Sequence, residues 1–257
     1  MNILQAIILG IVEGITEFLP ISSTGHMILV GKLLNIPQTD FLSSFEIIVQ
    51  LGAIFAVVVM YFPMLIKKIS FWPKLLVAFI PTSIIGFILY KLVKHVLLGS
   101  AWITVVALFV GGIVFILLEK FFAKKEAQTI SLDQMTLKQS FIIGVTQALS
   151  IIPGVSRSAA SIFGGMAGGL NRETAVLFSF ILAIPTMIAA TGLDLSKSNV
   201  IFSSQEIFLL SIGLVTACMT ALIAIKSFLA FVKTHTFIPF AYYRIIIAVI
   251  FAVFFLI

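Results

Sequence analysis

Residues 10–26 read GIVEGITEFLPISSTGH, and residues 144–158 read GVTQALSIIPGVSRS. Each stretch interrupts a long apolar region with proline, glycine and hydroxyl side chains. The 257-residue chain around them is 61% hydrophobic and only 10% charged, whereas a soluble domain carries about 25% charged residues. A soluble fold of this composition would expose too much apolar surface. The composition therefore excludes soluble enzymes, disordered chains and nucleic-acid-binding proteins, and it predicts an integral membrane protein.

Six other stretches are apolar and approach the length that a membrane-spanning helix needs, about 20 residues. They are 45–62, 74–90, 101–118, 174–192, 206–225 and 241–257. The two interrupted regions, 2–34 and 139–170, are divided at 19–25 and 152–158 into halves that are too short to span alone. The expected fold is an all-α polytopic integral membrane protein with about six full transmembrane helices and two re-entrant broken-helix hairpins.

The two interrupted stretches align with each other when a one-residue gap is allowed, and three spans follow each of them. This pattern predicts one membrane domain, 1–257, built of inverted repeats 1–118 and 139–257 joined by a cytoplasmic loop, 119–138. Broken helices in such repeats meet near the membrane midplane. Irregular backbone is tolerated there only beside protein or a water-filled cavity. The breaks are therefore expected to line one polar cavity, unless similar apolar composition produced a chance match.

The distribution of Lys and Arg predicts the orientation. Placing the 119–138 loop in the cytoplasm puts ten of these residues on the cytoplasmic side and four on the other, as the positive-inside rule requires. Both termini then lie outside, and the first broken segment enters from outside. The net charge of +6 is explained by these loops, so nucleic acid is not an expected partner.

Two glutamates stand four residues apart before the first break. On a helix Glu13 and Glu17 share one face, and an ionisable residue within a membrane segment indicates a functional site. The pair could ligate a divalent cation such as Mg²⁺ or Ca²⁺ through oxygen, or one carboxylate could act as a general base. A solvated helix end at the outer surface is the alternative interpretation.

The first break is rich in hydroxyl groups. Ser22, Ser23 or Thr24 could cap the half-helix that follows, but three hydroxyls in a row exceed what a cap needs. His26 stands three residues after Ser23, so its imidazole can reach that hydroxyl, and the two could act as nucleophile and base. Ser22 and Glu17 are also candidate partners of this imidazole. A structural role for this histidine is the alternative.

The second break supplies a positive charge. Arg157 carries a planar guanidinium that suits phosphate or carboxylate, and Ser156 and Ser158 add donors. The next half-helix presents free N–H groups and a positive dipole end, while Gly154 would let backbone approach a ligand closely. We interpret this break as an anion site, most naturally for phosphate. Alternatively, Arg157 neutralises a glutamate of the first break, and both roles are compatible.

The motifs EGITEFLPISSTGH (13–26) and PGVSRS (153–158) resemble the two signatures of the BacA-type undecaprenyl-pyrophosphate phosphatases. The resemblance covers nearly the whole chain in length, span number and motif placement. It implies hydrolysis of undecaprenyl pyrophosphate to the monophosphate and inorganic phosphate. This reaction recycles the lipid carrier for cell-wall synthesis and is associated with bacitracin resistance. The resemblance also implies a divalent cation and an active site at the outer face of the bacterial plasma membrane.

The matched motif positions imply the catalytic roles. Glu13 and Glu17 match the acidic pair, which is expected to bind the metal. Ser23 matches the proposed nucleophile, and His26 matches the essential histidine. Arg157, together with Ser156, matches the phosphate-binding pair. The full set of expected substrate-binding residues is Ser22, Thr24, Gly154, Ser156, Arg157, Ser158 and Ser161.

One expected binding residue departs from the family pattern. Ser161 occupies a position where the family commonly has threonine, and its hydroxyl is expected to keep the role. Besides the polyprenyl pyrophosphate substrate, the expected partners are membrane lipids and a second copy of the chain in a homodimer.

The sequence leaves the mechanism and one competing function open. Ser23 could attack the terminal phosphorus while His26 shuttles the proton, or a water activated by Glu17 could attack directly. Inverted repeats and broken helices are also typical of secondary transporters. A transporter or lipid flippase with an anion site at the midplane is therefore the competing hypothesis. A transporter needs access from both sides, whereas a phosphatase needs access from one.

Overall fold

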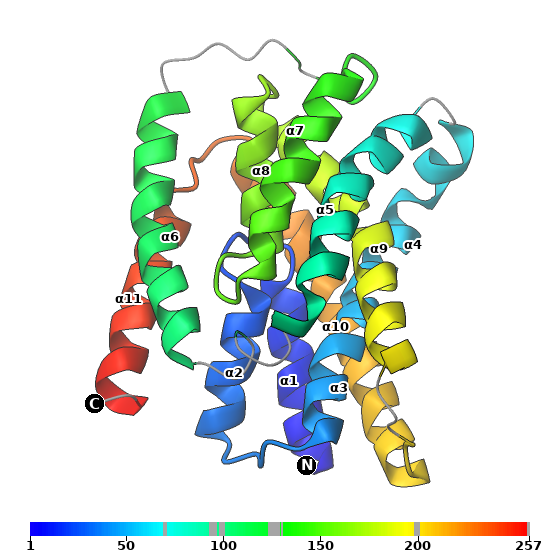
Figure 1. Cartoon of the computed structure of the whole chain (residues 1–257), viewed down its shortest axis with the longest axis vertical. Coiled ribbons are helices and arrows are strands. Elements are labelled where there is room, and N and C mark those ends of the chain that lie inside the picture. The colour runs from blue at the N-terminus through cyan, green and yellow to red at the C-terminus, as the bar shows by residue number, and fades with distance from the viewer. Residues whose placement is uncertain are drawn as a thin grey trace.

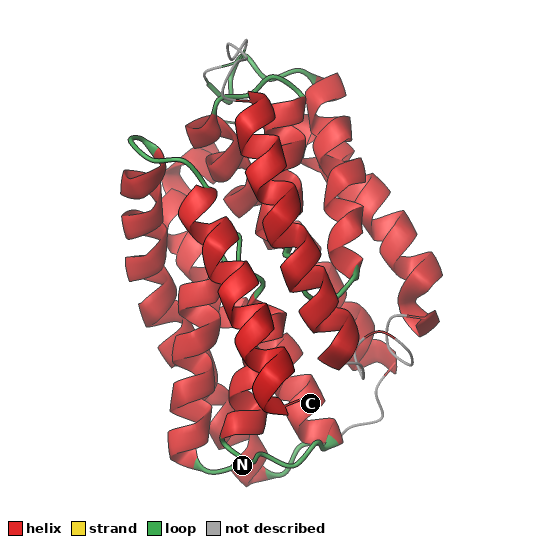
Figure 2. Cartoon of the chain, turned by 90° about the vertical axis from the view of Figure 1, so that its left-hand side faces the viewer, coloured by secondary structure: helices red, strands yellow, loops and turns green. Residues whose placement is uncertain are grey.

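The fold is a bundle of helices joined by loops (Figures 1 and 2). The computed structural model describes residues 1–68, 71–92, 97, 101–122, 129, 131–197 and 201–255. The helices of the first half are α1 (Ile3–Thr16), α2 (Ser23–Leu33), α3 (Asp40–Ile48), α4 (Gln50–Lys67), α5 (Trp72–Leu92) and α6 (Ala101–Phe122). Those of the second half are α7 (Leu137–Gln147), the short 3-10 helix η3 (Ala148–Ile151), α8 (Arg157–Ala167), α9 (Arg172–Lys197), α10 (Ser204–Val232) and α11 (Ile238–Phe255).

Within the described residues, five helical stretches are long and apolar enough to cross a membrane. They are Asp40–Lys67, Trp72–Leu89, Ala101–Phe122, Arg172–Lys197 and Ser204–Val232. They contain or largely overlap five of the six predicted spans. The sixth prediction, 241–257, falls on α11, whose apolar stretch Ile238–Val253 is shorter, and residues 256–257 lie outside the described part. The chain is thus an all-helical protein with several helices able to span a membrane.

Helix caps extend these helices beyond the apolar runs from which they were predicted. Ser203 caps α10 in a reciprocal pair with Glu206, so this helix begins at 204 and not at 206; it ends at 232, beyond the predicted 225. The same reciprocal arrangement begins α1 at Asn2 and α7 at Thr136. A capping box satisfies two N–H groups that the helix leaves unpaired. The predicted 119–138 loop is shorter as a result, and its residues 123–128 and 130 lie outside the described residues.

Both broken segments turn back partway through the molecule (Figure 1). α1 starts at the end that carries both termini, and α2 returns to that end, where residues 34–39 lead into α3. α7 starts at the opposite end, and α8 returns there after the break that follows η3. The two turns touch in the middle of the bundle, because the Ser158 hydroxyl donates a 2.8 Å hydrogen bond to the carbonyl of Leu19.

The two returning helices have the same backbone design. α2 and α8 contain 11 residues each. Each is capped by a serine with positive φ, 73° at Ser22 and 79° at Ser156. Each is followed by a residue in the left-handed region, Asn35 and Gly169. The paired positions keep one constant sequence separation, so the helices correspond without the gap that aligning the two prolines required.

Glycines let the outgoing half-helices lie close to full-length neighbours. A Cβ at Gly10 or Gly14 of α1 would collide with Thr216 or with the backbone of α10. At Gly144 of α7 it would collide with the Ala78 carbonyl of α5. Such small-residue contacts are how membrane helices approach each other closely. They fix both breaks at the centre of the bundle.

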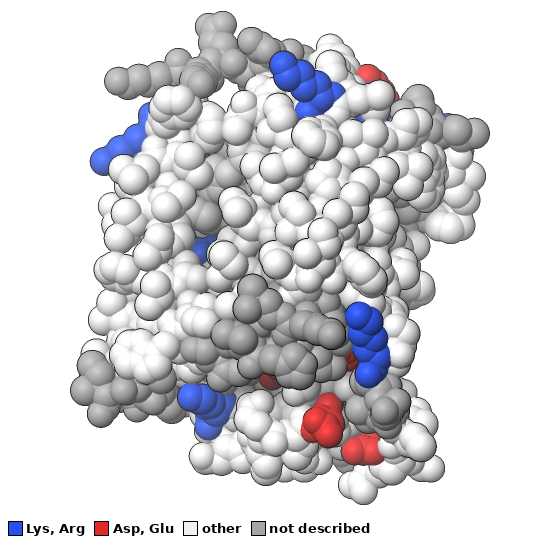
Figure 3. All heavy atoms as spheres, in the orientation of Figure 1, with Lys and Arg blue, Asp and Glu red and all other residues white. Residues whose placement is uncertain are grey.

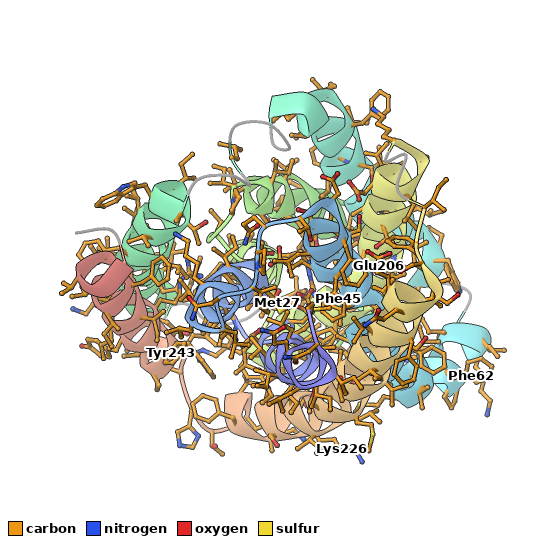
Figure 4. All side chains as sticks on the ribbon, turned by 90° about the horizontal axis from the view of Figure 1, so that it is seen from below. Met27, Phe45, Phe62, Glu206, Lys226 and Tyr243 are labelled. Atoms are coloured by element: carbon orange, nitrogen blue, oxygen red, sulfur yellow. The ribbon has the colours of Figure 1, made fainter. Side chains whose placement is uncertain are left out.

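Charged side chains gather at the two ends of the molecule. On the face shown in Figure 3 the broad middle is mostly uncharged. Large apolar side chains such as Phe62 and Ile88 are exposed around this middle zone, and Phe62 lies at the periphery when the bundle is viewed from below (Figure 4). An apolar belt between two charged ends is the surface that a lipid bilayer requires.

Candidate active site

A cavity of about 2010 Å³ extends from the end that carries the N-terminus to the middle of the bundle. Met1, Asp40 and Glu206 line it near that end, and Arg157 lines its deep end. Viewed from below, Met27 of its wall lies near the centre of the bundle (Figure 4). The walls are contributed mainly by α2, α3, α5 and α9. The cavity therefore connects one end of the molecule with the second break.

Glu17 joins the two breaks. α1 ends at Thr16, and the carboxylate of the next residue turns toward both returning helices. Its Oε2 accepts a 2.5 Å hydrogen bond from the Ser23 hydroxyl, and its Oε1 forms a 2.8 Å salt bridge with Nη2 of Arg157. All three side chains are buried. A hydroxyl, a carboxylate and a guanidinium from three different helices or breaks thus form one connected chain.

Arg157 is held from the side opposite Glu17. Its Nη1 donates to the backbone carbonyl of Ser179 at 2.8 Å and to the hydroxyl of that residue at 3.3 Å. The Ser179 hydroxyl lies 2.6 Å from that of Ser161. The Phe18 ring lies against the guanidinium carbon, 5.7 Å away. The Nε of Arg157 is buried and has no hydrogen-bond partner among the described residues, so this donor is available to a ligand.

Glu13 is fully buried, and neither of its carboxylate oxygens has a partner within the described part of the chain. It lies near enough to interact electrostatically with Glu17 and with Glu46 of α3. Glu46 lines the cavity, and its Oε1 is also unpartnered. The described residues hold no group of three or more His, Cys, Asp or Glu arranged to bind a metal. Mg²⁺ commonly uses only one or two carboxylates plus waters and substrate phosphates, so these orphaned oxygens fit such an ion.

Both ring nitrogens of His26 contact groups other than the Ser23 hydroxyl, with which the sequence paired this histidine. Its Nδ1 lies 2.8 Å from the carbonyl of Ser22, and its Nε2 lies 2.8 Å from the Tyr243 hydroxyl. The two rings stack with centroids 5.5 Å apart, and Tyr243 lies on the α11 side of the bundle in Figure 4. Because a carbonyl only accepts, Nδ1 carries a proton here. Ser23 is the first residue of α2, and its hydroxyl donates to Glu17. Glu17, and not His26, is therefore the partner of this hydroxyl.

A family model described as "Bacitracin resistance protein BacA" matches residues 6–250 of this chain. The chain belongs to the BacA family. A relative from Aquifex aeolicus named undecaprenyl-diphosphatase is 52% identical over 252 residues, which is 98% of either chain. Relatives with the same name are 50% identical in Persephonella marina, over 99% of either chain, and 49% identical in Wolinella succinogenes, over 98% of this chain and 97% of the relative.

Two of the predicted binding residues of this BacA-family chain line the cavity, Thr24 and Arg157. Ser22 and Ser156 instead cap helices: their hydroxyls accept hydrogen bonds from the backbone N–H of Gly25 and of Ala159. Caps of this kind satisfy donors that the helix leaves unpaired. These two serines shape the N-termini of α2 and α8.

The other predicted binding residues also have protein partners. Ser158 donates to the first break, and Ser161 contacts Ser179 and so supports Arg157 indirectly. Gly154 has φ of 93°, and a Cβ there would collide with the carbonyl of Thr104 on α6. Helix packing and backbone conformation therefore require a glycine here, and the predicted close approach of a ligand stays a prediction.

Sequence reasoning assigned no site role to four side chains of this BacA-family chain. Glu46 and Ser179 lie in stretches able to span a membrane. Glu46 lines the cavity near Glu13, and Ser179 accepts a hydrogen bond from Arg157. Tyr243 and Arg244 belong to α11. Tyr243 contacts His26 of α2, and Arg244 contacts both breaks. The arginine carried a usable signal, because a charge inside an apolar span indicates a functional position. The serine and the tyrosine carried none.

Proposed function

We propose that this chain hydrolyses undecaprenyl diphosphate to undecaprenyl phosphate and inorganic phosphate. It thereby returns the lipid carrier to cell-wall synthesis and confers bacitracin resistance. The single observation that carries the proposal is the chain of Ser23, Glu17 and Arg157 beside the deep end of the cavity. The similarity to undecaprenyl-diphosphatases over almost the full chain supports this substrate. The protein acts as a multi-pass protein of the bacterial plasma membrane.

The short hydrogen bond from Ser23 to Glu17 supports a covalent mechanism. As the Ser23 oxygen attacks the terminal phosphorus, its proton passes to Glu17. The bridging P–O bond breaks, and undecaprenyl phosphate leaves with the proton that Glu17 returns to it. A water molecule, deprotonated by Glu17, then attacks the phosphoserine. The bond between Ser23 and phosphorus breaks, and Ser23 regains its proton from Glu17 as inorganic phosphate leaves. This sequence regenerates the serine and divides one displacement into two easier ones.

The salt bridge between Arg157 and Glu17 couples proton transfer to charge stabilisation. A protonated carboxyl no longer holds the guanidinium by charge. The positive charge of Arg157 then becomes available as negative charge develops on the transferring phosphoryl group. Donors placed where charge develops are usually the largest contribution to such catalysis. Ser179 keeps the arginine in place during this exchange.

Carboxylate oxygens of Glu13 and Glu46 would hold the divalent cation. Both glutamates keep buried oxygens without a partner in the described structure, and oxygen is the donor that Mg²⁺ and Ca²⁺ prefer. When bound, such an ion neutralises negative charge on the diphosphate. Glu17 is committed to Ser23 and Arg157, so we assign it to proton transfer rather than to the metal pair that the sequence suggested.

In the proposed membrane arrangement, six spans surround two re-entrant hairpins that belong to inverted repeats 1–118 and 139–257. The matching caps and lengths of α2 and α8 support the repeat. The active site is proposed to face the outside. The cavity opens at the end that carries the N-terminus, and the distribution of Lys and Arg predicts that this end lies outside. A homodimer is a further proposal, which the mass of the detergent-solubilised protein would test.

Phosphate release from undecaprenyl diphosphate in detergent tests the function. We expect rapid release by the wild type and loss of release in Glu17→Gln and Arg157→Ala. A chelator should stop the wild type, and added Mg²⁺ should restore it. Detergent removes any gradient, so release also separates a hydrolase from a transporter. A folded wild type that releases no phosphate but carries anions across vesicles would overturn the proposal.

A further inference from the structure

Arg244 of α11 is fully buried and contacts both breaks. Its Nη2 donates to the carbonyls of Gly154 at 2.7 Å and Ala107 at 3.2 Å. Its Nη1 donates to those of Val155 at 2.9 Å and Pro20 at 3.2 Å. Its Nε lies 3.4 Å from the carbonyl of Leu108. The guanidinium therefore bonds the first break, the second break and α6 at the same time.

These contacts use the whole donor capacity of the side chain. A guanidinium has five N–H donors in a fixed plane and no acceptor, and Arg244 makes five hydrogen bonds to five carbonyls. It forms no salt bridge with an acidic residue among the described residues. The Phe115 ring lies 4.7 Å from the guanidinium carbon, and Gly111 leaves the room that Nη2 occupies. The five carbonyl dipoles stabilise the buried positive charge of Arg244, as a carboxylate would in a salt bridge.

The held carbonyls belong to the residues that lead directly into α2 and α8. Pro20 stands three residues before Ser23, and Val155 stands two residues before Arg157. Backbone carbonyls in a break at membrane depth need a donor from the protein. The single guanidinium of Arg244 donates hydrogen bonds to carbonyls of both breaks. The N-termini of both returning helices are thereby fixed relative to each other.

We propose that Arg244 is a positioning residue: it holds the two breaks in register, so that Ser23 and Arg157 meet at Glu17. It does not touch the substrate. A lysine cannot replace it, because an ammonium has three donors on one atom and cannot reach carbonyls spread around a plane. This inference rests on the proposed function and deepens it.

The test compares Arg244→Lys with the wild type in phosphate release. We expect kcat to fall about 100-fold, since a misplacement of about 1 Å costs that much, while KM changes by less than about threefold. Substrate still enters the same cavity past Thr24. Thermal unfolding of the same samples, followed in detergent, shows whether each variant is folded at the assay temperature.

Arg172→Lys is the matched control. Arg172 also joins separate helices, since it binds the buried Glu119, which in turn accepts from the backbone N–H of Phe237. This cluster lies at the other end of the bundle. A merely structural arginine should lower the unfolding temperature and leave the kcat of the folded protein unchanged, as we expect for Arg172→Lys.

Gly111→Ala is the second variant. It keeps Arg244 but places a methyl group where Nη2 lies, so it should reduce kcat in the same way, and it decides the matter if Arg244→Lys does not fold. An active wild type with unchanged kcat in folded Arg244→Lys or Gly111→Ala would overturn this inference alone. An inactive wild type would instead overturn the proposed function.

Discussion

The two breaks share a backbone and differ in chemistry. In both, a serine with positive φ caps a helix of 11 residues, and both helices end at a left-handed residue. The first residue after the cap is Ser23 in one break and Arg157 in the other. The position that holds Glu13 in α1 holds Gln147 in α7. One break thus supplies the carboxylates and hydroxyl, and its counterpart supplies the positive charge.

This difference shows how two breaks with the same backbone geometry can form a one-sided site. Two equivalent breaks with the same side chains would face each other with like charges, which repel. Unlike side chains on the same backbone meet as partners, and the salt bridge between Arg157 and Glu17 is the result. The backbone that the two breaks share positions the side chains, and the side chains that differ between them form the site.

The largest expected effect comes from removing the hydroxyl that only the first break offers. Ser23→Ala should reduce kcat at least about 1000-fold under the covalent mechanism, as loss of a nucleophile does in other hydrolases. Phosphate release measures it, with Ser211→Ala on the exposed face of α10 as control. A folded Ser23→Ala protein that keeps a tenth of wild-type turnover would favour direct attack by water.

A smaller effect is expected when the second break keeps a positive charge at residue 157 but loses the planar guanidinium. In Arg157→Lys an ammonium can bond Glu17 or Ser179 but cannot span both, because it lacks the planar fork. We expect kcat/KM to fall about 100-fold, whereas Arg172→Lys stays within about threefold of wild type. Equal kinetics of Arg157→Lys and wild type would remove the guanidinium from the phosphate role.

Making the two broken segments more alike in sequence should lower the stability of the protein. Gln147 donates to the hydroxyls of Thr82 and Thr186, and these hydroxyls already donate to the carbonyls of Gly144 and Leu182. Gln147→Glu would lose both hydrogen bonds and bury a carboxyl without donors. We expect a loss of about 2–3 kcal/mol of stability, seen as a lower unfolding temperature.

Gln147→Met separates the two contributions to that loss. It removes the amide without adding an acid, so it should cost about 1 kcal/mol. A Gln147→Glu protein as stable as the wild type, or more active, would show that the asymmetry between Glu13 and Gln147 is unimportant.

The smallest effect lies outside both breaks. The hydrogen bond from Lys68 at 2.6 Å lowers the pKa of Asp133. Because the folded pKa lies below the unfolded one, the pair stabilises the fold above the unfolded pKa, about 4. That contribution is lost as the pH falls through the folded pKa. Unfolding temperatures from pH 7 to pH 3 should decline slightly less in Asp133→Asn than in wild type. Identical slopes would contradict this.

Most of the fold followed from local signals in the chain. Apolar runs located the long helices, and proline with hydroxyl residues located both breaks, because these features act within one turn or one span. Helix limits were less accurate: the apolar run 206–225 lies within the helix 204–232, and the Ser203 cap begins this helix before its apolar run. The ion pair of Arg157 with a glutamate was one of two interpretations of the motif, and it is present.

The sequence by itself determined that this is a membrane protein and which two segments carry the polar groups of the site. Composition and short motifs can be read along the chain without knowing its fold. Only the tertiary structure decided the partners within the site. Ser23 bonds Glu17 where the spacing suggested His26, and His26 bonds Tyr243. Arg244 reaches carbonyls of both breaks. The contacts of Tyr243 and Arg244 depend on how α11 packs beside the two breaks, and the bond between Ser23 and Glu17 depends on how the first break folds back. No spacing along the chain encodes that geometry.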